Sequence, residues 1–468
     1  MNTELIYSDA SALAELIRTG KVTSAEVVQA YLDRIHAVDP QLKAIVSLNE
    51  NALDEARAAD DALASGEAVG PFHGVPFTVK DSIDTAGVLT QRGSPIFAGR
   101  VPDADATSVA RMKTAGGILL AKTNLPEFSY ACESDNLLTG TTNNPWNLER
   151  TSGGSSGGES AAIAAGLSPI GLGTDLTISV RGPAALTGIV ALKPTHGRVP
   201  MTGIWPREPR RVWHVGPMAR SVRDVELAYS VLNGPDGADG ASVAPNGYDA
   251  GVGSTPSRQL RVGWFVDSGL GPVDPEVAQT VRNAAEALRT AGAQVEEVSI
   301  PALRADNPLA LFYKQHVNEL KPAVAAATAG HEGQMYKYTK ALMETPLTPV
   351  EEYVDVEQAF DRIRDGYAEY FSRFDAVILP VLPIPAYPHG AATFVIDGET
   401  VDAGHIQSYT VQFNVTGLPA LSLRFGTSSE GLPIGVQVAA AWHAESTVLH
   451  IGKLLEQAST VRDRHPEI

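Results

Sequence analysis

Short apolar runs alternate with alanine-rich helical stretches along this chain, and this alternation constrains the fold more than any other feature. In the first half, the apolar runs are GVPFTVK at 74–80, GILLAK at 117–122, SPIGLGT at 168–174 and GIVALK at 188–193. Helical patterns such as SVARMKTAG at 108–116 lie between them. Alternating elements of this kind favour an α/β layered fold.

The second half continues the pattern. RVGWFVD at 261–267, a helical stretch at 276–292 and AQVEEVSI at 293–300 predict a β-α-β unit. Two later apolar runs, AVILPV at 376–381 and PIGVQVAA at 433–440, are expected to extend the same sheet. The fold class predicted is therefore α/β, with a mixed β-sheet core flanked by α-helices.

The chain is expected to form one domain over residues 1–468. N-terminal helices are indicated by the capping box from Thr23 to Glu26, and residues 233–257 are rich in Gly, Pro, Asp and Ser, as a surface connection would be. The expected parts are N-terminal helices (1–65), the core motifs described below (66–232), the surface connection (233–257) and the C-terminal part of the sheet (258–468).

Charge and composition exclude several function classes. Lys and Arg total 36 against 54 Asp and Glu, so the formal net charge is −18 and nucleic acid is not an expected partner. No apolar run approaches the roughly 18 residues of a membrane span, and the N-terminus lacks a signal-peptide pattern, so we expect a cytoplasmic protein without a membrane partner. The one cysteine, Cys132, excludes internal disulfides, and the 11 histidines lack metal-ligand spacing, so no metal is expected.

The stretch TSGGSSGGES at 151–160 resembles a flexible linker, but the helix-forming AAIAAG follows it directly. We therefore interpret it as a backbone shaped for chemistry, because glycines let main-chain N–H groups approach a ligand. GGSSG also fits the nucleophile elbow of a Ser-His-Asp hydrolase. An elbow requires a preceding strand, whereas NNPWNLERT is turn-like, so this alternative is disfavoured.

Two other segments could carry chemistry. In GLGTDLTISVRGPAA, we expect Asp175, Ser179 and Arg181 on a tight loop between two strands, where Asp175 and Arg181 pair and leave the serine free to react. In HGVPFTVKD, apolar side chains alternate toward the core, which places Lys80 on the opposite face at the end of a strand. Strand ends that face a cleft are common sites of reactive groups in α/β proteins.

Several ordered motifs together resemble the amidase signature family of serine hydrolases. The similarity covers nearly the whole chain and is weakest over 200–215 and 300–400. The motifs that carry it are GVPFTVKD, TNLPEFSY, NPWNLERTSGGSSGGESAA, GLGTDLTISVRGPAA, LKPTHGRVP, GPMARSVRDVELAYSVLNGPD and FNVTGLPALSLRFGTSSEGLPIGVQVAA.

The resemblance implies a Ser-cis-Ser-Lys triad that needs no cofactor. The matching positions are Ser179 as nucleophile, Ser155 as the bridging serine at a cis peptide, and Lys80 as the base. Oxyanion donors would be the backbone N–H groups of Leu176, Thr177, Ile178 and Ser179. Ser156, Asp175 and Arg181 are expected to support the two loops structurally.

One departure from the family pattern concerns the nucleophile loop. The family usually has two glycines where this chain has Thr177 and Ile178, and positive φ angles there would strain both residues. Similar loops occur in members resembling aryl acylamidases and urethane-cleaving hydrolases, which favours a small aryl amide or carbamate as substrate. Ile178 would then line the floor of the acyl site.

Aromatic side chains in stretches near the expected cleft could hold such a substrate; these are Phe128, Tyr130, Trp205 and Trp213. Cys132 is expected to be a small buried hydrophobe, and His196 and His214 to hydrogen-bond locally. Nothing in the sequence indicates an oligomeric state. Two alternatives remain open: one component of an amidotransferase, which passes ammonia to a partner acting on aminoacyl-tRNA, and an inactive binding scaffold.

Overall fold

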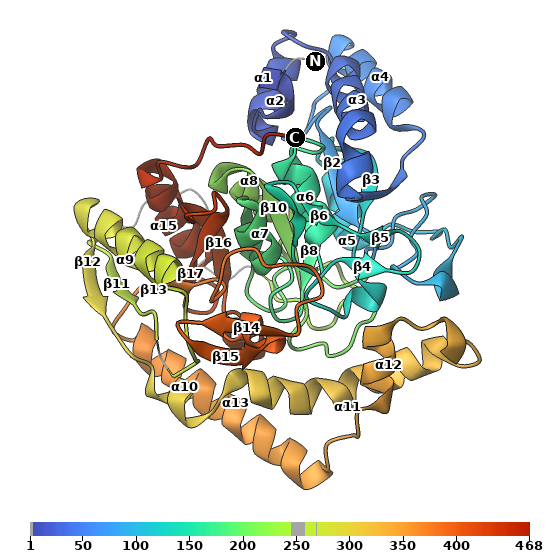
Figure 1. Cartoon of the computed structure of the whole chain (residues 1–468). Helices are drawn as coiled ribbons and strands as arrows, with labels where there is room; N and C mark the ends of the chain where they lie inside the picture. Colours follow the sequence, from blue (N-terminus) through green and yellow to red (C-terminus); the bar gives the residue numbers. More distant parts are fainter. Residues whose placement is uncertain (1–2, 245–257, 268) are drawn as a thin grey trace.

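An eleven-stranded mixed sheet forms the centre of the computed structural model, which describes residues 3–244, 258–267 and 269–468 (Figure 1). This architecture confirms the predicted α/β class. In spatial order the strands are β1 (Ile45–Leu48), β3 (Ile118–Thr123), β2 (Pro76–Lys80), β8 (Ile170–Asp175), β10 (His214–Ala219), β9 (Val190–Lys193), β16 (Ala420–Thr427), β17 (Pro433–Ala440), β13 (Ala376–Pro380), β11 (Arg261–Trp264) and β12 (Gln294–Glu297).

Strand direction changes along the sheet. β2 runs parallel to both β3 and β8, and β11 runs parallel to both β12 and β13, while the other neighbouring pairs are antiparallel. Three two-stranded hairpins lie outside this sheet: β4 (Asp135–Asn136) with β5 (Gly140–Thr141), β6 (Asn143–Asn144) with β7 (Asn147–Thr151), and β14 (Thr393–Ile396) with β15 (Glu399–Asp402).

Helices surround the sheet (Figure 1). Helix α8 contacts β10, α15 contacts β16 and α9 contacts β13, while α7 packs against α6, β9 and β17. The described helices are α1 (Thr3–Ile6), α2 (Ala10–Arg18), α3 (Ser24–Leu42), α4 (Ala52–Ala64), α5 (Thr107–Thr114), α6 (Gly157–Ala164), α7 (Arg181–Thr187), α8 (Val222–Leu232), α9 (Pro275–Thr290), α10 (Pro301–Ala305), α11 (Pro308–Thr328), α12 (Lys337–Glu344), α13 (Val350–Phe371), α14 (Val411–Val415) and α15 (Glu445–Ala458).

Local sequence signals account for several of these elements. Helix α3 begins at the predicted capping box, where the Thr23 side chain accepts from the N–H of Glu26 and the Glu26 side chain accepts from the N–H of Thr23. The predicted β-α-β unit is β11–α9–β12, and Asp274 caps α9 by accepting from the N–H of Glu276 at 2.8 Å.

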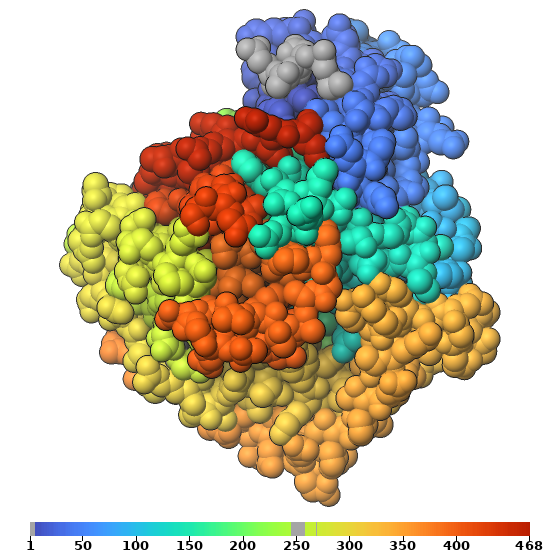
Figure 2. All heavy atoms as spheres, in the orientation of Figure 1, coloured from blue at the N-terminus to red at the C-terminus, as the bar shows by residue number. Residues whose placement is uncertain are grey.

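Other expectations need correction. Arg181 does not lie in a loop between two strands but begins the short buried helix α7. The stretch before Ser155, expected to be turn only, contains the β6–β7 hairpin. Residues 301–371 form a helical layer, α10 to α13, which runs along the lower side of the molecule in yellow and orange (Figure 2). Of the predicted surface connection, 245–257 lies outside the described residues.

Candidate active site

The carboxyl ends of β2 and β8 bring the motif residues to one edge of the sheet. Lys80 is the last residue of β2, and Asp175 is the last residue of β8. Parallel strands end at the same edge, so Lys80 and the loop after Asp175 lie near one another. The loop with Ser155 leads into α6, which packs against both strands.

Lys80 is fully buried, and its described hydrogen-bond partners are hydroxyl groups. Its Nζ lies 2.6 Å from Oγ of Ser155 and 2.9 Å from Oγ1 of Thr174. Burial lowers the pKa of Lys80 well below its ordinary value, against the opposing charges of Asp175 and Glu159. The site therefore favours an uncharged amine in contact with the Ser155 hydroxyl.

The loop with Ser155 is held against the segment with Ser179. The Gly154–Ser155 peptide is cis, as the resemblance implies. The N–H of Ser156 donates to the carbonyl of Ser179 at 3.2 Å, and Oγ of Ser156 lies 3.3 Å from both the N and the O of Thr174. Ser156 thus joins the two loops, although its side chain does not cap α6.

The glycines of this loop allow backbones to approach closely. A Cβ on Gly154 would lie 2.6 Å from the N of Glu133, and a Cβ on Gly158 would lie 2.4 Å from the N of Asn124. Such distances are shorter than carbon–nitrogen contacts allow, so only glycine fits without movement. The Gly/Ser stretch is a closely packed, buried segment rather than a linker.

Asp175 and Arg181 form a fully buried ion pair. The guanidinium contacts both carboxylate oxygens at 3.0 Å, and Asn414 Nδ2 donates to Oδ1 of Asp175 at 2.9 Å. Burial acts to raise the pKa of Asp175, but the charge and hydrogen bonds of Arg181 outweigh it and hold the pKa below its ordinary value. Arg181 also donates to the carbonyl of Thr177 at 3.0 Å, which fixes that peptide's orientation.

The loop 176–179 presents backbone donors. Neither Thr177 nor Ile178 has a positive φ, so replacing the usual glycines strains neither residue. Within the described residues, no acceptor is found for the N–H groups of Leu176, Thr177, Ile178 and Ser179. Buried N–H groups without acceptors are rare in folded proteins, and a group of them suits a substrate oxygen.

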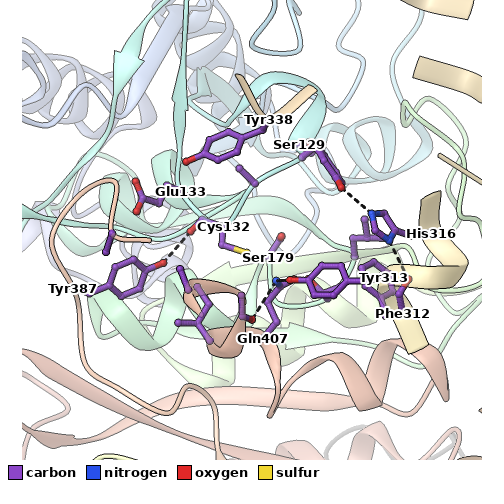
Figure 3. A pocket seen from close by; sticks show the side chains of 18 residues that line it. Ser129, Cys132, Glu133, Ser179, Phe312, Tyr313, His316, Tyr338, Tyr387 and Gln407 are labelled. Carbon is purple, nitrogen blue, oxygen red and sulfur yellow. Dashed lines mark hydrogen bonds between the residues drawn. The ribbon is translucent and has the colours of Figure 1, made fainter. Parts of the chain in front are cut away.

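A cavity of about 240 Å³ adjoins this loop, and most of its lining is aromatic or small (Figure 3). The described chain provides no Lys or Arg side chain to this lining. The lining residues are Ser129, Tyr130, Ala131, Cys132, Glu133, Leu176, Thr177, Ser179, Phe312, Tyr313, His316, Tyr338, Tyr387, Ala391, Ala403, Gly404, Ile406 and Gln407.

Hydrogen bonds order one wall of the cavity. His316 Nδ1 lies 3.0 Å from the Phe312 carbonyl, so it carries the proton, and Nε2 accepts from the Tyr130 hydroxyl at 2.8 Å. Burial lowers the pKa of His316 to about 4, so the ring is neutral. A second chain of hydrogen bonds meets this wall at Tyr313: the Thr177 hydroxyl donates to Gln407 at 2.6 Å, and Gln407 donates to the Tyr313 hydroxyl at 2.8 Å (Figure 3).

Of the four aromatic residues expected near the cleft, only Tyr130 lines this cavity. Phe128 packs edge-on against Trp205, with ring centroids 5.1 Å apart, because both belong to an apolar cluster under α11 and α12. Trp213 is 2 % exposed and packs in the main core.

Two further residues differ from expectation. The Ile178 side chain packs with Leu382 and neighbouring apolar residues, so it does not line the floor of the cavity. Cys132 is half-buried and lines the cavity, and burial raises the pKa of its thiol to about 12.

The Ser179 side chain also lines the cavity, but no described residue, including Ser155, hydrogen-bonds its hydroxyl.

Two polar residues near Lys80 were not singled out from the sequence. Thr174 precedes Asp175 in the motif GLGTDLTISVRGPAA. The alternation of side-chain direction along β8 could have indicated that Thr174 is a site residue. Glu159, in the GGES segment, is fully buried and accepts from the hydroxyls of Thr78 and Thr123. Burial raises the pKa of Glu159 to about 7, against those hydrogen bonds and nearby lysine charges.

Within the described ranges, no group of three or more His, Cys, Asp or Glu side chains could hold a metal ion. The same ranges contain no helix that is both long and apolar enough to cross a membrane.

A family model described as amidase matches residues 26–449, so the chain belongs to the amidase family. Two curated relatives are both named as the same component of glutamyl-tRNA(Gln) amidotransferase. The protein from Bdellovibrio bacteriovorus is 32% identical, covering 99% of this chain and 100% of the relative. The protein from Thermus thermophilus is 36% identical, covering 95% of each chain.

Several solved structures share this fold. A 6-aminohexanoate cyclic dimer hydrolase aligns with a TM-score of 0.86 at 30% identity over 99% of both chains. A bacterial aryl acylamidase aligns with a TM-score of 0.87 at 27% identity, covering 97% of this chain and 96% of that one. The corresponding glutamyl-tRNA(Gln) amidotransferase component of Thermotoga maritima aligns with a TM-score of 0.77 at 26% identity, covering 98% of this chain and 96% of that one.

Proposed function

We propose that this amidase-family enzyme hydrolyses a small aryl amide or aryl carbamate, with Ser179 as nucleophile, Ser155 as proton relay and Lys80 as base. The observation that carries the proposal is the buried Lys80 amine, 2.6 Å from Oγ of Ser155. An amine with its pKa lowered by burial can accept a proton near neutral pH.

In the first step, Lys80 takes the proton of Ser155 as Ser155 takes that of Ser179, and Ser179 attacks the substrate carbonyl carbon. For this step the Ser179 hydroxyl has to turn toward Ser155, because no hydrogen bond joins the two hydroxyls in the structure. Ser155 returns the proton to the leaving amine, which leaves an acyl-enzyme on Ser179. Water hydrolyses this ester by the reverse relay.

Negative charge on the carbonyl oxygen is stabilised by the N–H groups of the loop 176–179. Arg181 holds the Thr177 carbonyl, and in a trans peptide the N–H of Ile178 points the opposite way from that carbonyl. Backbone donors held in place before reaction stabilise an oxyanion without reorganisation. Thr177 and Ile178 provide the same N–H groups that glycines would, which opposes the inactive-scaffold alternative.

Cavity chemistry supports an aromatic substrate. Tyr130, Phe312, Tyr313, Tyr338 and Tyr387 contribute rings to the lining, and the volume of about 240 Å³ suits a small molecule. The likeness to a bacterial aryl acylamidase supports the same substrate class.

The curated relatives favour a second candidate, the equivalent component of a glutamyl-tRNA(Gln) amidotransferase. The chain would then release ammonia from glutamine and work with a partner protein. Glutamine carries a carboxylate, and no Lys or Arg side chain of the described chain lines the cavity to pair with it. This charge pattern is why we place the aryl amide or carbamate first.

One substrate panel separates these functions. The purified chain and its Ser179→Ala variant are assayed on an acetanilide, an aliphatic amide, an aryl carbamate and glutamine. We expect hydrolysis of the aryl substrates and a loss of about 1,000-fold or more in Ser179→Ala. Faster hydrolysis of glutamine than of every aryl substrate would support the amidotransferase candidate. Equal rates for the two proteins would indicate an inactive scaffold.

A further inference from the structure

One lining residue of the cavity carries a charge that the mechanism does not use. Glu133 is 8% exposed, and its two carboxylate oxygens both accept from a single donor, the N–H of Gly390, at 3.1 Å. Among the described residues it has no ion-pair partner. A buried carboxylate is costly in free energy unless a cation or several hydrogen-bond donors compensate it. The Glu133 carboxylate is therefore available to pair with a positively charged ligand.

Other groups near Glu133 do not replace such a ligand. Burial raises the pKa of Glu133, and the Gly390 N–H and the charges of His389 and Lys337 act in the opposite direction. Lys337 is directed elsewhere, since its side chain is 55% exposed and lies 3.7 Å from Asp135. His389 makes no hydrogen bond to Glu133 through either ring nitrogen.

Aromatic rings stand beside the carboxylate. Figure 3 shows Glu133 between Tyr338 and Tyr387 at one end of the cavity. Ring faces attract cations, and Lys337 Nζ already lies 4.9 Å from the centroid of Tyr338. The other described lining residues add no positive charge, because His316 is neutral and no described Lys or Arg side chain lines the cavity. The Lys337 ammonium contacts Tyr338 from outside this lining.

This end of the cavity is close to the proposed chemistry. The backbone of Glu133 packs directly on Gly154, the residue before Ser155. Glu133 and Ser179 line the same cavity, so a group bound at Glu133 lies in the cavity that also holds the proposed nucleophile. The formal net charge of −18 for the whole chain also favours the approach of cations.

We propose that Glu133, with Tyr338 and Tyr387, forms a subsite for a positively charged amine on the substrate, so that the preferred substrates are cationic aryl amides or carbamates. This inference rests on the proposed function and names its substrate class. Glu133 is a specificity-determining residue that binds the substrate away from the scissile bond.

Two matched substrates test the subsite. One acetanilide carries a trimethylammonium group on the ring, and the other carries a neutral tert-butyl group of the same shape. For the unmodified protein we expect kcat/KM to be about 10-fold or more higher for the cation. In Glu133→Gln, which can keep the Gly390 hydrogen bond, this ratio falls to about one. In Glu133→Lys, the ratio falls below one.

Glu149→Gln is the control, because it removes one exposed carboxylate that does not line the cavity. It should keep the preference of the unmodified protein. A cation preference that survives Glu133→Gln, or that Glu149→Gln removes equally, would overturn the subsite. If the Ser179→Ala variant matched the unmodified protein on the neutral substrate, the proposed function itself would fail, which is a separate result.

Binding without turnover gives an independent measurement. Ser179→Ala is titrated with benzyltrimethylammonium, and the titration is repeated with Glu133→Gln added to that variant. We expect the second change to weaken binding about 10-fold. Equal affinity in both proteins would contradict the subsite, whatever the rates show.

Discussion

Lys80 is the residue whose protonation state controls the proposed reaction. Only the uncharged amine can take the Ser155 proton, so kcat/KM should rise with pH through the pKa of Lys80. Burial lowers that pKa well below its ordinary value of 10.5, so the rise should be complete well below pH 10.5.

Replacing Lys80 with methionine keeps an unbranched side chain and removes the base. We expect Lys80→Met to lose about 1,000-fold or more in kcat/KM while its melting temperature stays the same or increases, because no amine has to be buried. Rate and thermal unfolding are measured on one sample. A variant that retains most of its activity would show that Lys80 is not the base.

Glu159 is a second residue with a testable effect on pH dependence. Above about pH 7 its negative charge raises the pKa of Lys80, so Glu159→Gln should move an acid limb of the kcat/KM profile in that range to lower pH.

The stability of the fold responds to Glu159 as well. The pKa of Glu159 rises from 4.5 to about 7 on folding, so the folded state holds the extra proton and stability falls as pH rises from about 4.5 to about 7.

In Glu159→Gln this loss of stability should be smaller. Denaturant titrations at pH 5 and pH 8 measure it, with Glu149→Gln, an exposed carboxylate, as control. If stability depended on pH identically in the two variants, Glu159 would not be the source of this loss of stability.

At the level of elements, the site depends on how closely α6 and its preceding loop pack against residues 124–134. Gly158→Ala would place a Cβ 2.4 Å from the backbone N of Asn124, so we expect destabilisation of about 2 kcal/mol or more. Gly333→Ala is the control, because no atom lies within 4 Å of its Cβ position and its φ is not positive. Chemical denaturation of both variants checks this, and equal stabilities would contradict the packing argument.

Strands and caps with strong local signals could be predicted from the sequence. The runs at β2, β3, β8 and β9 and the capping box of α3 were predictable because periodicity and capping are local properties. The Lys80, Ser155 and Ser179 motifs were recognisable through their order and spacing. Helix α7 was missed because its seven residues are too few for a clear 3.6-residue period.

The cavity wall could not be predicted in the same way. His316 hydrogen-bonds Tyr130, and Gln407 hydrogen-bonds Thr177, from segments more than 180 residues away in the sequence. Such contacts depend on how α11 and the segment before α14 pack, which no local pattern encodes. Phe128 and Trp205 lie in the right region, but they pack on each other instead of lining the cavity.

For the whole molecule, one continuous sheet joins the motif-bearing half to the C-terminal half, and the cavity receives residues from both. An enzyme that acts on a small amide with its own cavity needs no second protein. We therefore expect the purified chain to hydrolyse the proposed aryl substrates at a rate that no added protein increases. A strict requirement for a partner protein from the source cell would favour the amidotransferase candidate.

The most direct test of the account is the site of acylation. The protein is treated with an activated aryl carbamate whose carbamoyl-enzyme hydrolyses slowly, and digested peptides are analysed by mass spectrometry. We predict one carbamoyl group on Ser179, formed far more slowly in Lys80→Met. A carbamoyl group on Ser155 or Cys132 instead, with Ser179 unmodified, would contradict the central claim.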